Sequence, residues 1–360
     1  MTVICIIIAV IAVGIGGFFA FTSYQINQIP KMTFEDMLTY TTKNNENAII
    51  AVGIIQNGEA SYTLYGENGT TLSQTEHVYE IGSLTKTFTV SLLFKATSEG
   101  KVNLDDNIDQ YLDLPEKDYY PTIRRLITHT SGYKGYYFET QMISNFFHGR
   151  SDFYGISKEQ MIERIGKIDL EDRDYDFNYS NFGIAVVGAV LSEIYEEDYA
   201  TIINDYITEE LGLNNTKISD GSGDLGNYWD WSKNDAYMPA GALTSTIEDM
   251  LKYAQLQMNE MPEYLSDTHE VLAEVNATSG SNAKMNIHMD SIGAAWIIDT
   301  GNNIIWHNGG TDDYNCYLGF DLNKQIAVVV LSNLSPNYRI PATVMGVELL
   351  TDLQKESNGD

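Results

Sequence analysis

Basic residues are scarce in this chain of 360 residues. Lysine and arginine total 21 against 50 aspartates and glutamates, which gives a formal net charge of −29. Because a polyanion repels phosphates, this balance argues against nucleic acid and against an anionic membrane surface as partners. The charge indicates either solubility in an acidic or salty exterior, or attraction of cationic substrates such as esters and peptides that carry an amino group.

Cysteine is nearly absent as well. The two cysteines are Cys5, in an apolar stretch, and Cys316, in a strand pattern far along the chain. They are not expected to pair, so the sequence predicts no disulfide framework. No internal repeat or low-complexity tract is visible. A composition of 43% hydrophobic and 20% charged residues is typical of globular proteins, and the length suits one large or two small domains.

Charge is missing altogether from residues 3–21, which are almost wholly apolar. As a helix with about 1.5 Å rise per residue, this stretch is long enough to span a bilayer. No basic residue precedes it and no clear cleavage site of small residues follows, which favours an uncleaved anchor over a cleaved signal peptide. A signal peptide and a buried core helix are the alternatives. Lys31 is the first basic residue, so charge does not set the orientation.

The rest of the chain predicts one catalytic domain. We expect a membrane anchor or signal segment at 1–24, a linker at 25–35 and the domain at 36–354. Its sheet part takes residues 36–100 and 285–354, around a helical insertion at 101–284. Strands are predicted at 48–55, 60–65, 70–80, 291–298, 303–306, 314–320 and 325–332. Helices are predicted at 32–43, 123–128, 158–165, 184–194, 199–210, 246–258 and 341–353.

Ser83 and Lys86 form the most informative pattern, because residues three apart on a helix are neighbours. A serine hydroxyl is a poor nucleophile until a base takes its proton, and an amine with a lowered pKa can do so. The apolar helix that follows would offer its unpaired N–H groups and positive dipole end to an oxyanion at this serine. Ser281 and Lys284 repeat the pattern in a Ser/Gly/Asn stretch that predicts a loop, so they are not chosen.

Two later motifs add candidate groups. Tyr179 and Asn181 precede a predicted helix; a tyrosine near cations can lose its proton below its usual pKa and act as a base. The alternative is a core tyrosine beside an ordinary helix cap, Ser180 or Asn181. His307 and Gly309 follow a predicted strand whose small residues would let the backbone approach a ligand. The alternative there is a surface histidine in a turn.

Together these motifs resemble the serine beta-lactamase and penicillin-binding-protein family. The similarity is greatest to its class C beta-lactamase-like branch, which includes lactamases, D-alanyl-D-alanine carboxypeptidases, D-aminopeptidases and esterases. It covers nearly all of residues 36–350, and further matching stretches are 100–106, 122–132, 239–246 and 307–311. The resemblance implies an α/β (α+β) fold, in which helices flank an antiparallel sheet. A helical subdomain is inserted, and the active site lies in the cleft between them.

The resemblance also implies acyl transfer. Ser83 attacks a carbonyl while Lys86 and Tyr179 share the removed proton, and which of the two is the base stays open. His129 lies in a matching stretch that is structural in this family. Neither metal nor organic cofactor is expected. The acidic stretch at 220–224 starts like a calcium loop, but Trp231 stands at the position of the last ligand.

Substrate binding is assigned by the same resemblance. Asn181, His307 and Gly309 would bind or orient the substrate, and the backbone N–H groups of Ser83 and Gly310 would form the oxyanion hole. In one respect the chain departs from the family. Lactamases and carboxypeptidases usually carry lysine where this chain has His307, which is mostly neutral at pH 7. The departure weakens the case for substrates with a carboxylate and favours esters or amides of D-amino acids.

We therefore expect a membrane-anchored extracytoplasmic serine hydrolase that acts on the cell wall. D-alanyl esters of teichoic or lipoteichoic acid are the preferred substrate. The alternatives are a D-Ala-D-Ala carboxypeptidase or D-aminopeptidase on peptidoglycan peptides, a weak beta-lactamase, and a penicillin- or wall-binding sensor without turnover. The expected location is the cell membrane, with one span and an extracellular catalytic domain; secretion after signal cleavage is the alternative. The partner is a wall polymer or peptide, and the sequence does not indicate an oligomeric state.

Overall fold

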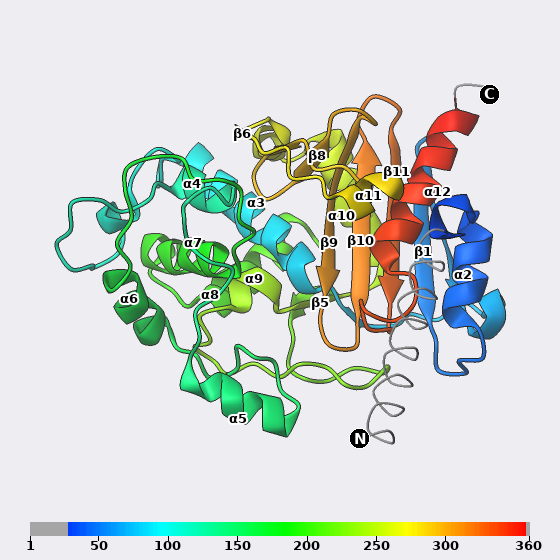
Figure 1. Ribbon diagram of the computed structural model, residues 1–360, viewed down its shortest axis with the longest axis horizontal. Helices are drawn as coiled ribbons and strands as arrows, with labels where there is room; N and C mark the ends of the chain where they lie inside the picture. The colour runs from blue at the N-terminus through cyan, green and yellow to red at the C-terminus, as the bar shows by residue number, and fades with distance from the viewer. Residues whose placement is uncertain (1–27, 358–360) are drawn as a thin grey trace, which may run out of the picture.

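An eight-stranded antiparallel sheet forms the centre of the computed structural model, which describes residues 28–357 (Figure 1). Its strands lie in the order β2-β1-β11-β10-β9-β8-β7-β6. Strands from the two ends of the chain meet where β1 pairs with β11, with Val52 opposite Val330. The bounds are β1 Ile50–Gln56, β2 Glu59–Tyr65, β6 Ala273–Glu274, β7 Ser291–Ile292, β8 Ile297–Asp299, β9 Ile304–Gly310, β10 Asn315–Asp321 and β11 Ile326–Ser332.

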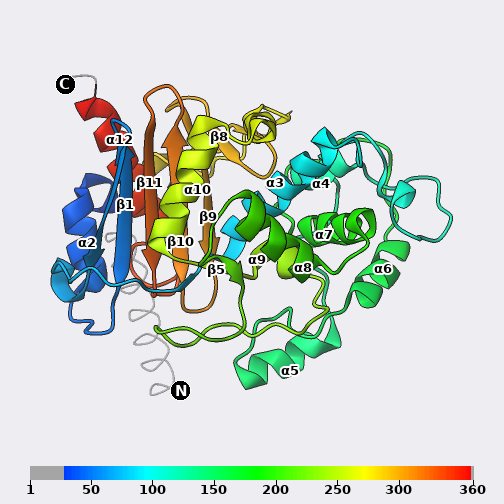
Figure 2. The same cartoon turned by 180° about the vertical axis from the view of Figure 1, so that it is seen from behind.

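Helices cover both faces of this sheet. Successive side chains of a strand point to opposite faces, and those of β1 divide accordingly. Ile50 and Val52 pack in one apolar cluster with α2 (Phe34–Thr42) and α12 (Ala342–Glu356). Ala51 belongs to the cluster on the other face, with α10 (Ile247–Asn259) and α3 (Thr85–Ser98). Figure 2 shows α10 on that face, in front of β10 and β11.

Most of the remaining helices lie to one side of the sheet, beyond α3 (Figure 1). They are α4 Ile123–Ile127, α5 Thr140–His148, α6 Lys158–Gly166, α7 Asn181–Tyr195, α8 Tyr199–Asp205 with a π-helical turn at Tyr206–Glu210, and α9 Met238–Gly241. A small sheet, ordered β3-β5-β4, joins Tyr79–Glu80, Leu243–Ser245 and Lys217–Ile218. The structure thus confirms an antiparallel sheet flanked by helices, with a helical part between strands from the two ends of the chain.

Four local predictions were wrong. The strand predicted at 291–298 is a hairpin of two short strands, β7 and β8. Residues 70–80 are not one strand, because within this stretch only Thr71 and β3 pair with another strand. The predicted loop around Ser281 and Lys284 contains a short helix, α11 (Gly280–Lys284), capped by the side chain of Ser279. The strand predicted at 303–306 continues to Gly310, so His307 lies inside β9 and not after it.

The expected membrane anchor falls outside the described residues, which begin at Gln28. Within residues 28–357, no helix has the length and apolar character needed to cross a membrane. The later part of the expected linker is described: Ile29–Lys31 forms a 3-10 turn, and α2 already begins at Phe34.

Candidate active site

Ser83 lies in a tight connection between a strand and a helix. β3 ends at Glu80, a 3-10 turn covers Gly82–Leu84, and α3 starts at Thr85. The serine therefore precedes the first turn of α3 and does not form part of its regular spiral. The N–H of Ile81 donates to Leu243 O at 3.0 Å, which ties this connection to β5.

Lys86 is the buried partner of this serine. Its exposed fraction is 0%, and its Nζ lies 3.0 Å from Ser83 Oγ and donates to the carbonyl oxygen of Ala240 at 2.6 Å. Burial holds the pKa of Lys86 well below the ordinary lysine value, because desolvation penalises the charged form. A neutral amine at hydrogen-bond distance from a hydroxyl has the geometry of a general base.

Tyr179 lies close to Lys86, with its ring centroid 4.9 Å from Nζ. Burial raises the pKa of Tyr179 above its usual value near 10, and a hydrogen bond with Ser83 only partly opposes this rise. The prediction of a lowered tyrosine pKa was therefore wrong. The physical reason is that desolvation disfavours the charged phenolate, and it also lowers the pKa of Lys86, the expected cationic neighbour. Tyr179 is held as the neutral phenol.

His307 lies within β9, opposite Leu318 of β10. Its exposed fraction is 0%, which rules out the alternative of a surface histidine. Burial, aided by Lys86, lowers the pKa of His307 to about 3, so the imidazole is neutral as the sequence predicts. Its Nδ1 lies 2.6 Å from the carbonyl oxygen of Asn308 and therefore carries the proton. Its Nε2 is buried without a partner among residues 28–357.

Glycines let β9 pack against the backbone that carries Ser83. A Cβ on Gly309 would lie 1.9 Å from the carbonyl oxygen of Ile81. A Cβ on Gly82, whose φ is +46°, would lie 2.7 Å from the nitrogen of Gly310. This packing places the backbone of Gly310 beside the turn of Ser83, which is the arrangement that the predicted oxyanion hole needs.

Asn181 is the first residue of α7, and Ser180 before it is the cap. The Ser180 side chain accepts a hydrogen bond from the N–H of Gly183 at 2.8 Å. Oδ1 of Asn181 is buried without a partner among the described residues. The structure therefore gives the capping role to Ser180, and the side chain of Asn181 is free for the predicted role in binding.

Two neighbours of this group had no assigned catalytic role. Ala240 accepts the hydrogen bond from Lys86; its only signal in the sequence was the matching stretch at 239–246. His129 was expected to be structural, and its ring lies 4.7 Å from that of Tyr179. Neither contact could be inferred from spacing, because the partners are far apart along the chain.

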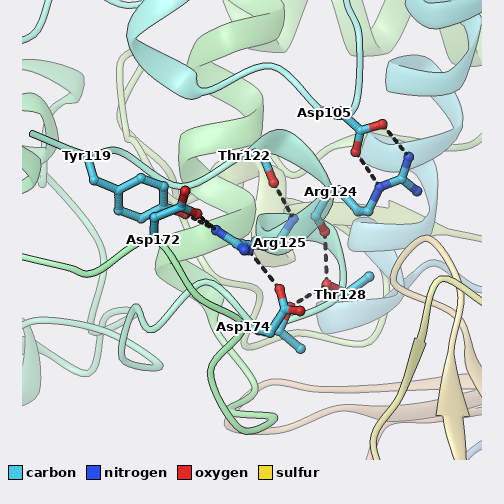
Figure 3. Close-up of polar contacts among 9 residues, drawn as sticks. Asp105, Tyr119, Thr122, Arg124, Arg125, Thr128, Asp172 and Asp174 are labelled. Atoms are coloured by element: carbon cyan, nitrogen blue, oxygen red, sulfur yellow. Dashed lines mark hydrogen bonds and ion pairs between the residues drawn. The ribbon is translucent and has the colours of Figure 1, made fainter.

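Ion pairs connect α4, in the stretch at 122–132, with two other segments. Arg124 binds Asp105 with both Nε and Nη2, at 2.7 and 3.0 Å. Arg125 bridges Asp172 at 2.7 Å and Asp174 at 2.8 Å, as Figure 3 shows. These contacts fasten the segment that leads to Tyr179 onto the helix that leads to His129.

The chain offers no candidate metal site within residues 28–357, where no group of three or more His, Cys, Asp and Glu side chains is placed to hold an ion. A cavity of about 520 Å³ lies away from the candidate site, against α6, α7, α8 and α9. Its lining includes Pro239 and Met238 but none of the predicted site residues.

Residues 38–344 match the family model described as Beta-lactamase. The chain belongs to the beta-lactamase family. It is thus a member of a family of serine hydrolases, to which the penicillin-binding-protein-like enzymes also belong. The match covers the residues that precede β1 and extends into α12, so it includes every element that positions the candidate site.

Curated relatives agree with this assignment, and solved structures share the fold. Protein flp of Staphylococcus aureus (strain MW2) is 22% identical over 286 residues, 72% of this chain and 53% of the relative. Beta-lactamase-like protein 2 of Dictyostelium discoideum is 29% identical over 221 residues, 54% of this chain and 38% of the relative. The chain therefore spans about half or less of the length of these relatives.

Among solved structures, the octameric penicillin-binding protein homologue from Pyrococcus abyssi has a TM-score of 0.68 at 20% identity, over 95% of this chain and 77% of that one. A beta-lactamase/D-alanine carboxypeptidase from Yersinia pestis, complexed with citrate, has a TM-score of 0.66 at 19% identity, over 92% and 99%. At these identities the likeness shows the fold alone.

Proposed function

We propose that this member of the family is a D-alanyl esterase that acts on teichoic or lipoteichoic acid through an acyl-enzyme on Ser83. The observation that carries the proposal is His307. Burial lowers the pKa of His307 to about 3, so β9 offers a neutral imidazole where a substrate carboxylate would need a cation. A D-alanyl ester has no carboxylate on its acyl group and carries an ammonium, which suits a chain of net charge −29.

The first half of the reaction forms the acyl-enzyme. Ser83 Oγ bonds to the ester carbonyl carbon as its proton passes to Lys86, the group that burial keeps neutral. The N–H groups of Ser83 and Gly310 stabilise the oxyanion, each by about 3–4 kcal/mol if they act like the donors of a protease. The bond from carbon to the polymer oxygen then breaks, and that oxygen takes a proton from Tyr179. Lys86 returns its proton to Tyr179.

Hydrolysis repeats these steps with water. Water adds to the carbonyl carbon of the acyl group on Ser83 and gives a proton to Lys86. The serine oxygen then leaves and is protonated again. Free D-alanine is released and the site is restored. Asn181 orients the acyl group, since its side chain is not used in capping α7.

The second candidate is a D-Ala-D-Ala carboxypeptidase or D-aminopeptidase, which the intact set of Ser83, Lys86 and Tyr179 would equally serve. Purified protein offered D-alanylated lipoteichoic acid and a stem pentapeptide separates the two. We expect D-alanine to be released from the polymer; release from the peptide alone would refute the esterase. Ser83→Ala should abolish release from either substrate while the melting temperature stays within a few degrees.

A sensor without turnover is distinguished by the fate of the acyl group. A stable adduct of penicillin or a fluorophosphonate on Ser83, with no release of D-alanine from any substrate, would replace the esterase by a wall-binding sensor. Turnover of nitrocefin at lactamase-like rates would instead make the chain a beta-lactamase.

The proposed location is the outer side of the cell membrane, held by the uncharged residues 3–21. Full-length protein should remain in the membrane fraction after washing with high salt and carbonate, and a chain that lacks residues 1–24 should not. Recovery of a shortened mature chain in the medium would support secretion after cleavage instead.

A further inference from the structure

His129 has a backbone conformation that few residues other than glycine and asparagine adopt. α4 ends at Ile127, Thr128 follows, and His129 has φ +58°, in the left-handed region. A Cβ is disfavoured there, so a helix usually ends in glycine or asparagine at such a position. The hydrogen bond that Nδ1 of His129 accepts gives its side chain a use at this position.

His129 accepts hydrogen bonds from the two residues on either side of Tyr179. The carbonyl oxygen of His129 accepts the N–H of Asn178 at 2.9 Å, and its Nδ1 accepts the N–H of Ser180 at 3.1 Å. The N–H groups of the residues before and after Tyr179 are therefore both bound by one residue. The first bond uses only backbone atoms, whereas the second needs the imidazole. The two rings also touch, with centroids 4.7 Å apart.

The second bond determines the chemical form of the imidazole. Nδ1 accepts the hydrogen bond from the Ser180 N–H, so the neutral ring carries its proton on Nε2, which is buried without a partner among residues 28–357. Burial keeps the pKa of His129 well below its ordinary value, and the nearby Lys86 and His307 lower it further. Phe177 and Tyr179 complete its aromatic surroundings.

We propose that His129 is a positioning residue for Tyr179, and that its Nδ1 fixes the peptide that sets the phenol beside Ser83 and Lys86. The inference rests on the proposed role of Tyr179 as proton donor. His129 itself does not touch the substrate. The ion pairs of Arg125 with Asp172 and Asp174 support the same junction from its outer side (Figure 3).

Asparagine keeps the acceptor, whereas His129→Gly suits the left-handed backbone without one, so rescue by Asn but not by Gly separates positioning by Nδ1 from a merely structural role. Its Oδ1 stands as many bonds from the backbone as Nδ1 of histidine, and asparagine tolerates the left-handed region. With p-nitrophenyl acetate as the probe, His129→Ala should lower kcat about tenfold to a hundredfold at similar KM, because small displacements of a reacting group are costly. His129→Asn should recover most of that loss. The exposed His148→Ala is the matched control and should match the wild type.

A double-mutant cycle with Tyr179→Phe tests the route of the effect. If His129 acts through Tyr179, His129→Ala should cost little more in the Tyr179→Phe background. If the losses in kcat of the two single variants multiply in the double variant, the proposal is overturned. An Asn variant as slow as the Ala variant would overturn it as well. If the Ala variant does not fold, the Asn variant decides alone: a kcat as low as that of Tyr179→Phe refutes positioning by Nδ1. If Tyr179→Phe and Ser83→Ala are both as active as the wild type, the proposed function fails instead.

Discussion

Single residues in this site derive their chemistry from burial. Lys86 and Tyr179 are both removed from water, and desolvation always disfavours the charged form. The pKa of the amine therefore falls, while the pKa of the phenol rises. A neutral base and a protonated acid result from one physical cause, without a charged partner for either. This division favours Lys86 as the base and Tyr179 as the acid.

The pH profile of kcat/KM should reflect this division. Lys86 is active when neutral, so the ascending limb should lie well below pH 10.5, the ordinary lysine value. Tyr179 is active when protonated, so the descending limb should lie above pH 10. Initial rates from pH 5 to 11 with an uncharged ester measure both limbs. A descending limb at neutral pH would contradict a protonated Tyr179.

Replacing Lys86 with methionine should remove the base without emptying the space. We expect kcat to fall by about 10²–10⁴. The free energy of unfolding should change by no more than about 2 kcal/mol. The variant loses the hydrogen bond to Ala240, but it also loses the desolvation cost of a buried amine, and the two effects offset each other. Ester hydrolysis and urea unfolding measure the two effects. Lys95→Met, at a partly exposed position on the same helix, is the control and should leave kcat unchanged.

At the level of elements, the site exists because β9 contacts the connection that precedes α3. The close approach depends on Gly309, where a Cβ would lie 1.9 Å from Ile81 O and 2.8 Å from Cys316 Sγ. Both neighbours belong to well-packed backbone or core, so neither can move aside easily. The register of β9 against β10 places Gly309 opposite Cys316 and leaves no freedom to shift by one residue.

Gly309→Ala should therefore lower the free energy of unfolding by about 3 kcal/mol and reduce activity in the fraction that remains folded. Denaturant unfolding and ester hydrolysis measure these effects. Gly280→Ala is the matched control, because a Cβ there meets nothing within 4 Å. Its effect should stay within about 1 kcal/mol. Equal stability of the two variants would contradict the packing described for β9.

Glu80 joins three elements behind the site. Its carboxylate accepts the hydroxyl of Thr311, just after β9, at 2.6 Å and the N–H of Trp229 at 2.6 Å. Burial raises the pKa of Glu80 to about 7, and Asp312 and Asp313 act in the same direction. Since the folded pKa lies above the unfolded value of 4.5, protonation stabilises the fold. That contribution is complete below about pH 4.5 and is lost as the pH rises through 7.

Glu80→Gln should remove this pH dependence. The variant should be more stable than the wild type at pH 8 by on the order of 3 kcal/mol, and the difference should vanish near pH 4.5. Urea unfolding at both pH values provides the measurement. The exposed Glu76→Gln is the control on the same segment and should track the wild type. A constant difference across this range would show that the pKa of Glu80 is not raised.

Local signals predicted some elements and failed for others. α7 and α10 were predicted because each follows a capping residue, Ser180 or Thr246, and carries a long apolar pattern. Residues 70–80 have strand-like composition, yet most of them meet no partner strand, and pairing is not a local property. α11 was missed because a helix of five residues has too little periodicity to distinguish it from a loop.

At the level of the whole molecule, the net charge of −29 produces a field that acts before binding. Such a field attracts cations over distances that salt shortens from about 10 Å at 0.1 M to about 3 Å at 1 M. The proposed substrate carries an ammonium on its acyl group. The surface charge as well as the neutral His307 would therefore favour substrates that carry an ammonium group.

A matched pair of esters tests this contribution. kcat/KM for a D-alanine p-nitrophenyl ester should fall severalfold between 0.02 and 0.5 M NaCl, because screening weakens the attraction. The N-acetyl-D-alanine ester of the same alcohol is uncharged and should be nearly indifferent to salt. Parallel salt curves for the two esters would mean that the net charge serves solubility alone.

The order and spacing of the motifs by themselves were enough to predict the family and a sheet whose strands come from both ends of the chain. They could do so because capping, periodicity and turn chemistry act over a few residues. Only the tertiary structure decided which protons the site holds. Lys86 donates to Ala240 across 154 positions of sequence, and His129 reaches Ser180 across 51. Desolvation sets these pKa values, and it depends on how distant segments pack.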